Sequence, residues 1–360
     1  MVKENALFSA NTSISIAYYV FIFFLLLTGG ISFIYLPPDQ SLIGISRMMI
    51  MPLTVIMFYN LYKSENIFIN QLSILVFIIF LACISLILQA TYGQEISIFG
   101  VPSLRSGLIR YSTSLGSITI FGQAVGIAFF LILTLKYKKI TKTFLIAVII
   151  IAVGISLSKS GVMNILIAST LVLFYVRKLS YIFIILLLFV SFYFLIIIFN
   201  EFIIFKYLNT MLFTAFRINL LDSTIPLGTP PVDIESIFDR LLGKFDLWDK
   251  NIYEIIFGIG VKGGAGAMGV KGVTSHNSYI DIWQMGGFSL IISFIILQIT
   301  TLINLFKLDT NTSTILFFSN IIIIANMFVQ NGVIFQPVTS FIFWMSVSYL
   351  IFNNSKKNVQ

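Results

Sequence analysis

Acid–base chemistry in this chain centres on His276, the single histidine among 360 residues. Imidazole exchanges a proton near neutral pH, so this side chain suits a general base or a hydrogen-bonding catalyst. Asn277 and Tyr279 follow closely and add polar groups to the same stretch. No second histidine and no carboxylate stand at metal-ligand spacing, so we expect neither a metal nor a cofactor. A structural histidine, satisfied by hydrogen bonds alone, is the alternative.

Several cationic residues are candidates for binding an anionic group such as a diphosphate. Arginine suits phosphate because its planar guanidinium donates two parallel hydrogen bonds to phosphate oxygens. Ordinary solvation is the alternative for those near the predicted membrane surface. These are Arg105, Arg110, Lys159, Arg217 and Arg240. Arg47 differs because it lies inside a predicted span, where a charge is costly and usually functional unless its long stem carries it to the interface.

Three glycines, Gly258, Gly260 and Gly263, have the spacing G-x-G-x-x-G. A dinucleotide site would require a strand before this motif and a helix after it. The sequence instead predicts a helix before it, so we interpret the segment as a glycine-rich loop that could close over a site.

Composition places most of the chain in lipid. Hydrophobic residues make up 58% and charged residues only 10%, whereas soluble domains carry about 25% charged residues. The first apolar stretch, 14–36, is too long for a removable signal peptide, so we expect an anchor that stays. The net charge of +8 is interpreted as membrane topology and not as nucleic-acid binding. Cys83 has no second cysteine with which to form an intrachain disulfide.

Apolar runs long enough to cross the membrane recur along the chain. A span needs about 20 such residues, and we predict about ten spans in an all-α, polytopic bundle. They lie near 14–36, 42–62, 70–90, 115–135, 143–157, 161–176, 180–205, 278–306, 312–333 and 338–352. A tight turn at 158–161 joins the fifth span to the sixth.

Positive charge orients the predicted bundle. Lysines crowd the short loop at 136–142, and other short connections and both ends of the chain carry basic residues. With ten spans all these charges fall on one side, which the positive-inside rule assigns to the cytoplasm. Both termini are then cytoplasmic, and the segments 91–114 and 206–275 lie outside.

The expected organisation has three parts. Spans one to seven occupy 1–205, a large outer loop occupies 206–277, and spans eight to ten occupy 278–360. Within the loop, Asp233 is typical of a helix N-cap, and apolar residues recur with helical periodicity as far as Ile256. We expect one amphipathic helix, lying either on the membrane–water boundary or on the mouth of the bundle.

Motifs in the second half of the chain follow a distinctive order. Arg240, Trp248 and Gly258-Ile259-Gly260 form an Arg…Trp…Gly-x-Gly pattern. His276-Asn277-Ser278-Tyr279-Ile280, followed by Gly286-Gly287, forms a His-Asn-x-Tyr…Gly pattern. Together they resemble segments of the O-antigen polymerase and O-antigen ligase superfamily of bacterial envelope glycosyltransferases.

Two upstream segments are similar to the same superfamily. Ser156-Leu157-Ser158-Lys159-Ser160-Gly161 resembles its Ser-x-Ser-Arg-x-Gly turn, with lysine in place of the usual arginine. Arg105-Ser106-Gly107-Leu108 resembles its Arg-x-x-Gly-Leu. The segment after Arg105 lacks the Asn-Pro-Asn found in relatives, so no role is carried over for 112–117.

The resemblance implies a surface-polysaccharide polymerase at the periplasmic face of the bacterial inner membrane. Such an enzyme joins oligosaccharide repeat units linked to undecaprenyl diphosphate. It implies His276 as the base and Arg240 as the first diphosphate ligand, with Arg217 and Arg105 as lesser candidates. Arg110, Arg47, Lys159, Asn277 and Tyr279 complete the expected substrate-binding set. Partners would be the lipid-linked oligosaccharide, membrane lipid and a chain-length regulator protein, with no nucleic acid.

Two other functions remain alternatives. An O-antigen ligase would transfer the finished glycan to lipid A-core. A lipid-linked oligosaccharide flippase would also be apolar and basic, but it would more naturally place its charges along a central cavity than in a large outer loop.

Overall fold

The computed structural model describes residues 13–61, 64–92, 103–105, 108–111, 113–116, 118–156, 158–176, 251–261, 277–329 and 333–357. His276, Arg217, Arg240 and the predicted span at 180–205 lie outside these residues.

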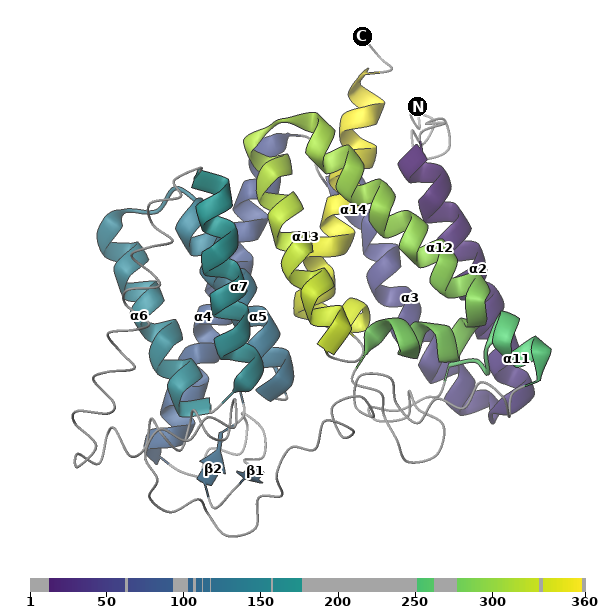
Figure 1. Cartoon of the computed structure of the whole chain (residues 1–360), viewed down its shortest axis with the longest axis horizontal. Coiled ribbons are helices and arrows are strands. Elements are labelled where there is room, and N and C mark those ends of the chain that lie inside the picture. Colours follow the sequence, from purple (N-terminus) through teal and green to yellow (C-terminus); the bar gives the residue numbers. More distant parts are fainter. Residues whose placement is uncertain are drawn as a thin grey trace. The chain divides into compact units, whose positions relative to one another are not determined.

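The chain is a helical, multi-pass membrane protein, as its composition predicts (Figure 1). Its helices are α2 (Ser13–Tyr35), α3 (Pro38–Leu61), α4 (Glu65–Tyr92), α5 (Ile118–Thr134), α6 (Lys139–Ser156), α7 (Lys159–Val176), α11 (Ile252–Phe257), α12 (Ser278–Leu308), α13 (Asn311–Val329) and α14 (Pro337–Lys357), with a 3-10 turn η3 (Val333–Phe335). Among the described residues, 5 helices are long and apolar enough to cross a membrane, or 6 if the two parts of α3 count as one span. Each predicted span that falls within the described residues coincides with a helix.

Three features depart from the predicted pattern. The segment after α4 contains a short antiparallel ribbon of β1 (Ser103–Arg105) and β2 (Leu108–Arg110), so the described residues are not entirely helical. Asn251 lies within the helix expected to run unbroken to Ile256, but it has an extended backbone and caps α11; the earlier part of that expected helix lies outside the described residues. Helix α3 bends by 42° around Pro52, because proline cannot donate the backbone hydrogen bond that a straight helix requires.

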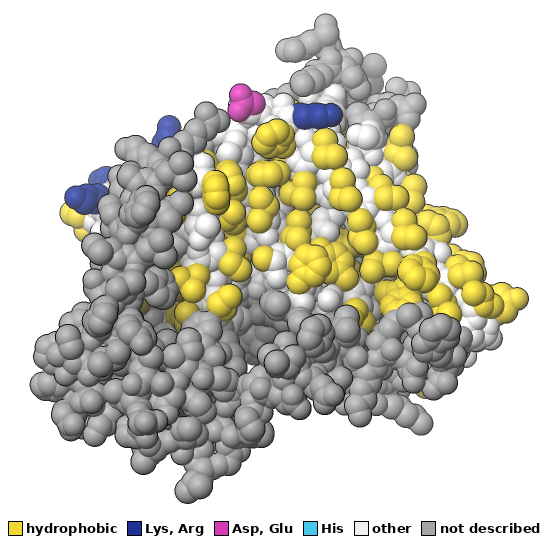
Figure 2. All heavy atoms as spheres, viewed as in Figure 1, with side chains coloured by type: hydrophobic (Ala, Val, Ile, Leu, Met, Phe, Trp, Pro, Cys, Tyr) yellow, Lys and Arg dark blue, Asp and Glu magenta, His cyan; other side chains and the backbone are white. Residues whose placement is uncertain are grey.

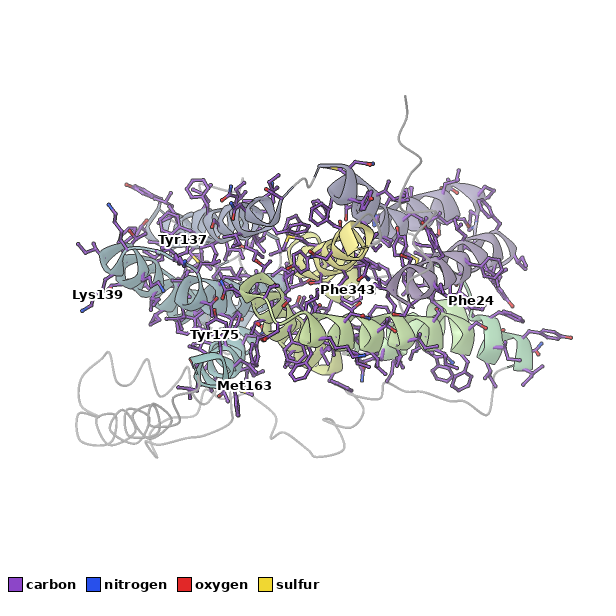
Figure 3. All side chains as sticks on the ribbon, turned by 90° about the horizontal axis from the view of Figure 1, so that it is seen from above. Phe24, Tyr137, Lys139, Met163, Tyr175 and Phe343 are labelled. Carbon is purple, nitrogen blue, oxygen red and sulfur yellow. The ribbon has the colours of Figure 1, made fainter. Side chains whose placement is uncertain are left out.

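The described helices divide into two compact units. Unit 1 comprises 1–70 and 234–360, and unit 2 comprises 71–233. In unit 1, α2 packs against α12, and α14 packs against α3. Aromatic side chains fill its interior, where Phe343 and Trp344 of α14 lie with ring centroids 5.6 and 5.7 Å from Phe294 and Phe21 respectively (Figure 3). This core holds the helices that carry the segments after His276.

Unit 2 is built around α5, which is buried along most of its length. It packs against both α6 and α7. The approach of α7 is close because Gly122 and Gly126 face Ser160 and Asn164 with no side chain between them. Asn164 then donates a 3.2 Å hydrogen bond to the Gly122 carbonyl.

Candidate functional site

Helix α12 is broken at Gly287. This residue has φ 63° and ψ −163°, which is a left-handed backbone conformation that glycine adopts without a side-chain clash. Figure 1 shows the first part of α12, from Ser278 to the break, running across the ends of the neighbouring helices instead of along them. The predicted span at 278–306 thus coincides with an apolar helix long enough to cross a membrane, and we call the part of α12 before its break, from Ser278 to Gly286, the head of α12. A break of this kind leaves backbone carbonyls of the preceding turn without their helical donors.

Residues 258–261 supply the missing donors. The N–H of Ile259 donates to the Gln284 carbonyl at 3.0 Å, and the N–H of Gly260 donates to the Met285 carbonyl at 2.9 Å. The Gly-x-Gly motif and the Gly286-Gly287 pair, separated in the sequence, thus form one structural element. We call this element, residues 258–261 with 284–287, the glycine junction.

Glycine is required at the junction because backbone meets backbone. A Cβ on Gly258 would overlap the Met285 carbonyl, and a Cβ on Gly287 would overlap the Ile256 carbonyl. Gly260 has φ 79°, and a Cβ there would lie 2.5 Å from the Cα of Ser32. Gly258 and Gly287 also have positive φ, so alanine would be strained at all three positions even without the overlaps.

The first span anchors the junction. Ser32 of α2 accepts a 2.6 Å hydrogen bond from the N–H of Val261 and donates one of 2.9 Å to the Thr28 carbonyl. Val261 is only 2% exposed and packs against Gly44 of α3. On the other side of the junction, the indole of Trp283 donates a 3.2 Å hydrogen bond to the Ile255 carbonyl. Helices α2, α3, α11 and α12 are therefore joined at one place.

Asn277 fixes the start of the head of α12. Its side-chain oxygen accepts a 2.9 Å hydrogen bond from the N–H of Tyr279, which is the geometry of a helix N-cap. The next residue, Ser278, accepts a 3.1 Å hydrogen bond from the N–H of Val333. The backbone directly after His276 is thus tied both to its own helix and to η3.

Tyr279 is held by its aromatic ring and its hydroxyl. The hydroxyl donates a 2.9 Å hydrogen bond to the side-chain oxygen of Gln298, and the ring centroid lies 4.9 Å from that of Phe328. The predicted role of Tyr279 in substrate binding stays a prediction. The observed contacts give it a clear structural task, which is to pack the head of α12 against the second half of the same helix and against α13.

Arg47 is an exposed residue of α3. It lies three residues, or just under one helical turn, after Gly44, against which Val261 packs. Arg47 therefore lies within about one helical turn of the residue that Val261, the last residue of 258–261, contacts. Asn277 lies at the other end of the head, about 13 Å of helix from the glycine junction.

The remaining described candidates belong to unit 2. Lys159 opens α7 just after Ser158, whose hydroxyl accepts a 3.1 Å hydrogen bond from the N–H of Gly161 and so caps the helix. Because α6 ends at Ser156 and α7 begins at Lys159, the connection is as tight as predicted, but residues 159–161 of the predicted turn belong to α7. In the ribbon, Arg105 pairs in register with Leu108, and Arg110 with Ser103.

Two buried polar residues near the glycine junction and in the head of α12 were not predicted from the sequence. Ser32 is fully buried and anchors the junction, and Asp281 in the head of α12 is only 1% exposed. An ionisable or polar residue within an apolar run is itself a signal of function or tight packing, and both were visible in that way.

Among the described residues, no group of three or more His, Cys, Asp or Glu side chains is placed to hold a metal ion. His276 and Arg240 lie outside those residues, so metal independence stays a prediction. Comparisons with known protein families, with curated proteins and with solved structures find no match to this chain. The resemblance to envelope glycosyltransferases therefore rests on the quoted motifs.

Proposed function

We propose that this protein is a surface-polysaccharide polymerase that joins oligosaccharide repeat units carried on undecaprenyl diphosphate. One observation carries the proposal. The Gly-x-Gly motif and the Gly286-Gly287 pair, which contribute to the resemblance from separate parts of the sequence, meet in the glycine junction. That junction closes the head of α12, and Asn277 opens the same head directly after His276. A shared structural task is a physical reason for these motifs to occur together.

The proposed reaction is a metal-independent glycosyl transfer. A hydroxyl of the incoming repeat unit attacks the anomeric carbon of the growing chain, and His276 takes the hydroxyl proton. The bond between that carbon and the diphosphate oxygen breaks, and undecaprenyl diphosphate leaves with the electron pair. Arg240, supported by Arg217 and Arg105, stabilises the negative charge on the leaving group. Arg47, Arg110 and Lys159 are further cations for holding the lipid-linked substrates.

The proposed setting is the bacterial inner membrane. Both termini lie in the cytoplasm, and the loop at 206–277 lies in the periplasm, where the lipid-linked units are joined. The lysines at 136–142 support this orientation through the positive-inside rule. A chain-length regulator protein is the proposed protein partner.

Purified variants test the chemistry. Lipid-linked repeat units, extracted from cells lacking the gene, would be incubated with equal amounts of each purified protein. His276→Gln should lose about 10²–10⁴-fold in elongation rate, which is the usual contribution of a general base. Arg240→Lys should also lose activity because lysine cannot reproduce the bidentate fork of arginine. Lys307→Gln, at the distant C-terminal end of α12, is the control and should elongate normally.

One result would contradict the role of His276. Near-normal elongation by His276→Gln would exclude it as the base.

A gene deletion separates the polymerase from the ligase. In cells, deletion of the gene should leave single repeat units on lipid A-core, because a separate ligase still acts. Long polymer stranded on undecaprenyl diphosphate would instead assign the ligase function.

A further inference from the structure

Helix α11 presents an apolar surface that no described part of the protein covers. Ile252 is 58% exposed, Tyr253 67% and Ile256 38%, in a helix of only six residues. Such exposure is unfavourable in water, since burial of an apolar side chain stabilises it by about 25 cal/mol per Å². Something other than water must therefore cover these three side chains.

Neighbouring surfaces identify the chemistry of that occupant. The end of α2 exposes Ile34 at 77%, and the part of α12 after its break exposes Phe288 at 47% and Ile292 at 52%. Figure 2 shows hydrophobic side chains extending over the face of α12 toward the end of unit 1 where Figure 1 places α11. Because α2 and α12 are long, apolar helices able to span a membrane, this surface meets lipid. The face of α11 continues it.

The hydrogen bond between Val261 and Ser32 indicates how deep α11 lies relative to the bilayer surface. Helix α2 has 23 residues and is about 34 Å long, slightly more than the hydrocarbon core of about 30 Å. Val261 is bonded to Ser32, which lies three residues, or about 4.5 Å, inside the end of α2. Interfacial helices bury their apolar face about 5–10 Å into the boundary between headgroups and acyl chains. The glycine junction thus holds α11 at the level where such helices lie.

Charge distinguishes this surface from an electrostatic membrane anchor. Between Asn251 and Val261 the only charged residue is Glu254, and no lysine or arginine is present. Tyrosine is enriched at the membrane–water interface, where its amphipathic ring lies at the level of the headgroups. Attachment should therefore depend on apolar burial and not on anionic headgroups.

We propose that α11 is a membrane-interface anchor, with Ile252, Tyr253 and Ile256 inserted among the lipids at the end of α2. Through the bonds of Ile259 and Gly260 to Gln284 and Met285, the anchor would also fix the height of the head of α12 relative to the bilayer surface. The inference concerns lipid contact alone, so it stands or fails separately from the proposed reaction.

Site-directed spin labelling in liposomes tests the anchor without any substrate. Cys83 is the only cysteine and is buried, so Cys83→Ala gives a background with no other labelling site. Labels would be placed singly at Ile252→Cys and Tyr253→Cys. Ile292→Cys serves as the lipid-facing control and Lys307→Cys as the aqueous control, since both positions are exposed. Collisions of each label with oxygen, which concentrates in lipid, and with a water-soluble nickel chelate would be measured.

The expected ratio of oxygen to nickel collisions at 252 and 253 lies close to that at 292 and well above that at 307. It should be equal in zwitterionic and anionic vesicles. Nickel access as high as at 307 would overturn the proposal by placing α11 in water. Labels shielded from both reagents would also overturn it, because another protein segment would then occupy the face. A ratio that rises only in anionic vesicles would contradict the apolar mechanism.

Discussion

Replacement of Gly260 by alanine should release residues 258–261 from the broken helix. Gly260 has φ 79°, a conformation that costs an L-residue roughly 1–2 kcal/mol. The new Cβ would lie 2.5 Å from the Cα of Ser32 and 2.8 Å from its backbone nitrogen. Neither of those atoms can turn aside as the end of a flexible side chain would, so the segment itself must move.

The size of the effect follows from the bonds that are lost. Three hydrogen bonds hold the segment, from Ile259 to Gln284, from Gly260 to Met285 and from Val261 to Ser32. If each contributes about 1 kcal/mol net, their sum is about 3 kcal/mol. That free energy corresponds to roughly a hundredfold change in the equilibrium between docked and released segments. The amides of 259–261 should exchange with solvent deuterium about that much faster in Gly260→Ala.

Hydrogen–deuterium exchange followed by mass spectrometry measures this directly in lipid nanodiscs. Gly30→Ala is the matched control because Gly30 lies in α2, close to Ser32, and a Cβ there would meet nothing within 4 Å. It should leave exchange at 259–261 unchanged. Equal protection of those amides in wild type and Gly260→Ala would refute the described role of the glycine junction.

Three further predictions address the cap, the orientation and the chemistry. Asn277→Ala should destabilise the head of α12 by about 1 kcal/mol through loss of its N-cap, whereas Asn277→Asp should retain most of it; thermal unfolding of the purified variants would show no difference if the cap is unimportant. Reporter fusions after Lys250 should be active in the periplasm and fusions after Lys139 in the cytoplasm, and the reverse pattern would invert the proposed topology. Elongation by the purified protein should survive EDTA, and its loss with recovery on adding Mg²⁺ or Mn²⁺ would contradict charge stabilisation by arginine alone.

Membrane helices were predictable because length and hydropathy act locally. A run of about 20 apolar residues needs no long-range partner to form a helix in lipid, where every backbone group must be satisfied internally. The turn at Ser158 was equally local, since a serine at a helix start caps the following N–H groups. Such features can be read from neighbouring residues alone.

The break in α12 could not be predicted because it depends on distant residues. The pair Gly29-Gly30 remains helical within α2, whereas Gly286-Gly287 breaks α12. The difference lies in the donors that 258–261 offer to the freed carbonyls. The cap at Asn251 was missed for another reason. Its side chain accepts a 3.3 Å hydrogen bond from the N–H of Tyr253, and this local cap is invisible to hydrophobic periodicity.

The ribosome synthesises one part of unit 1 at the beginning of translation and the other part at the end. These parts, 1–70 and 234–360, flank the whole of unit 2 in the sequence, and the bond from Val261 to Ser32 joins residues 229 positions apart. Helix α2 is therefore synthesised, and enters the membrane, before the ribosome has made the residues of 234–360 that pack against it. Ser32 is suited to that delay because its hydroxyl already donates to the Thr28 carbonyl within the same helix. A serine bonded in this way carries no free donor into lipid, yet it keeps an acceptor lone pair for the amide of Val261 when that residue arrives.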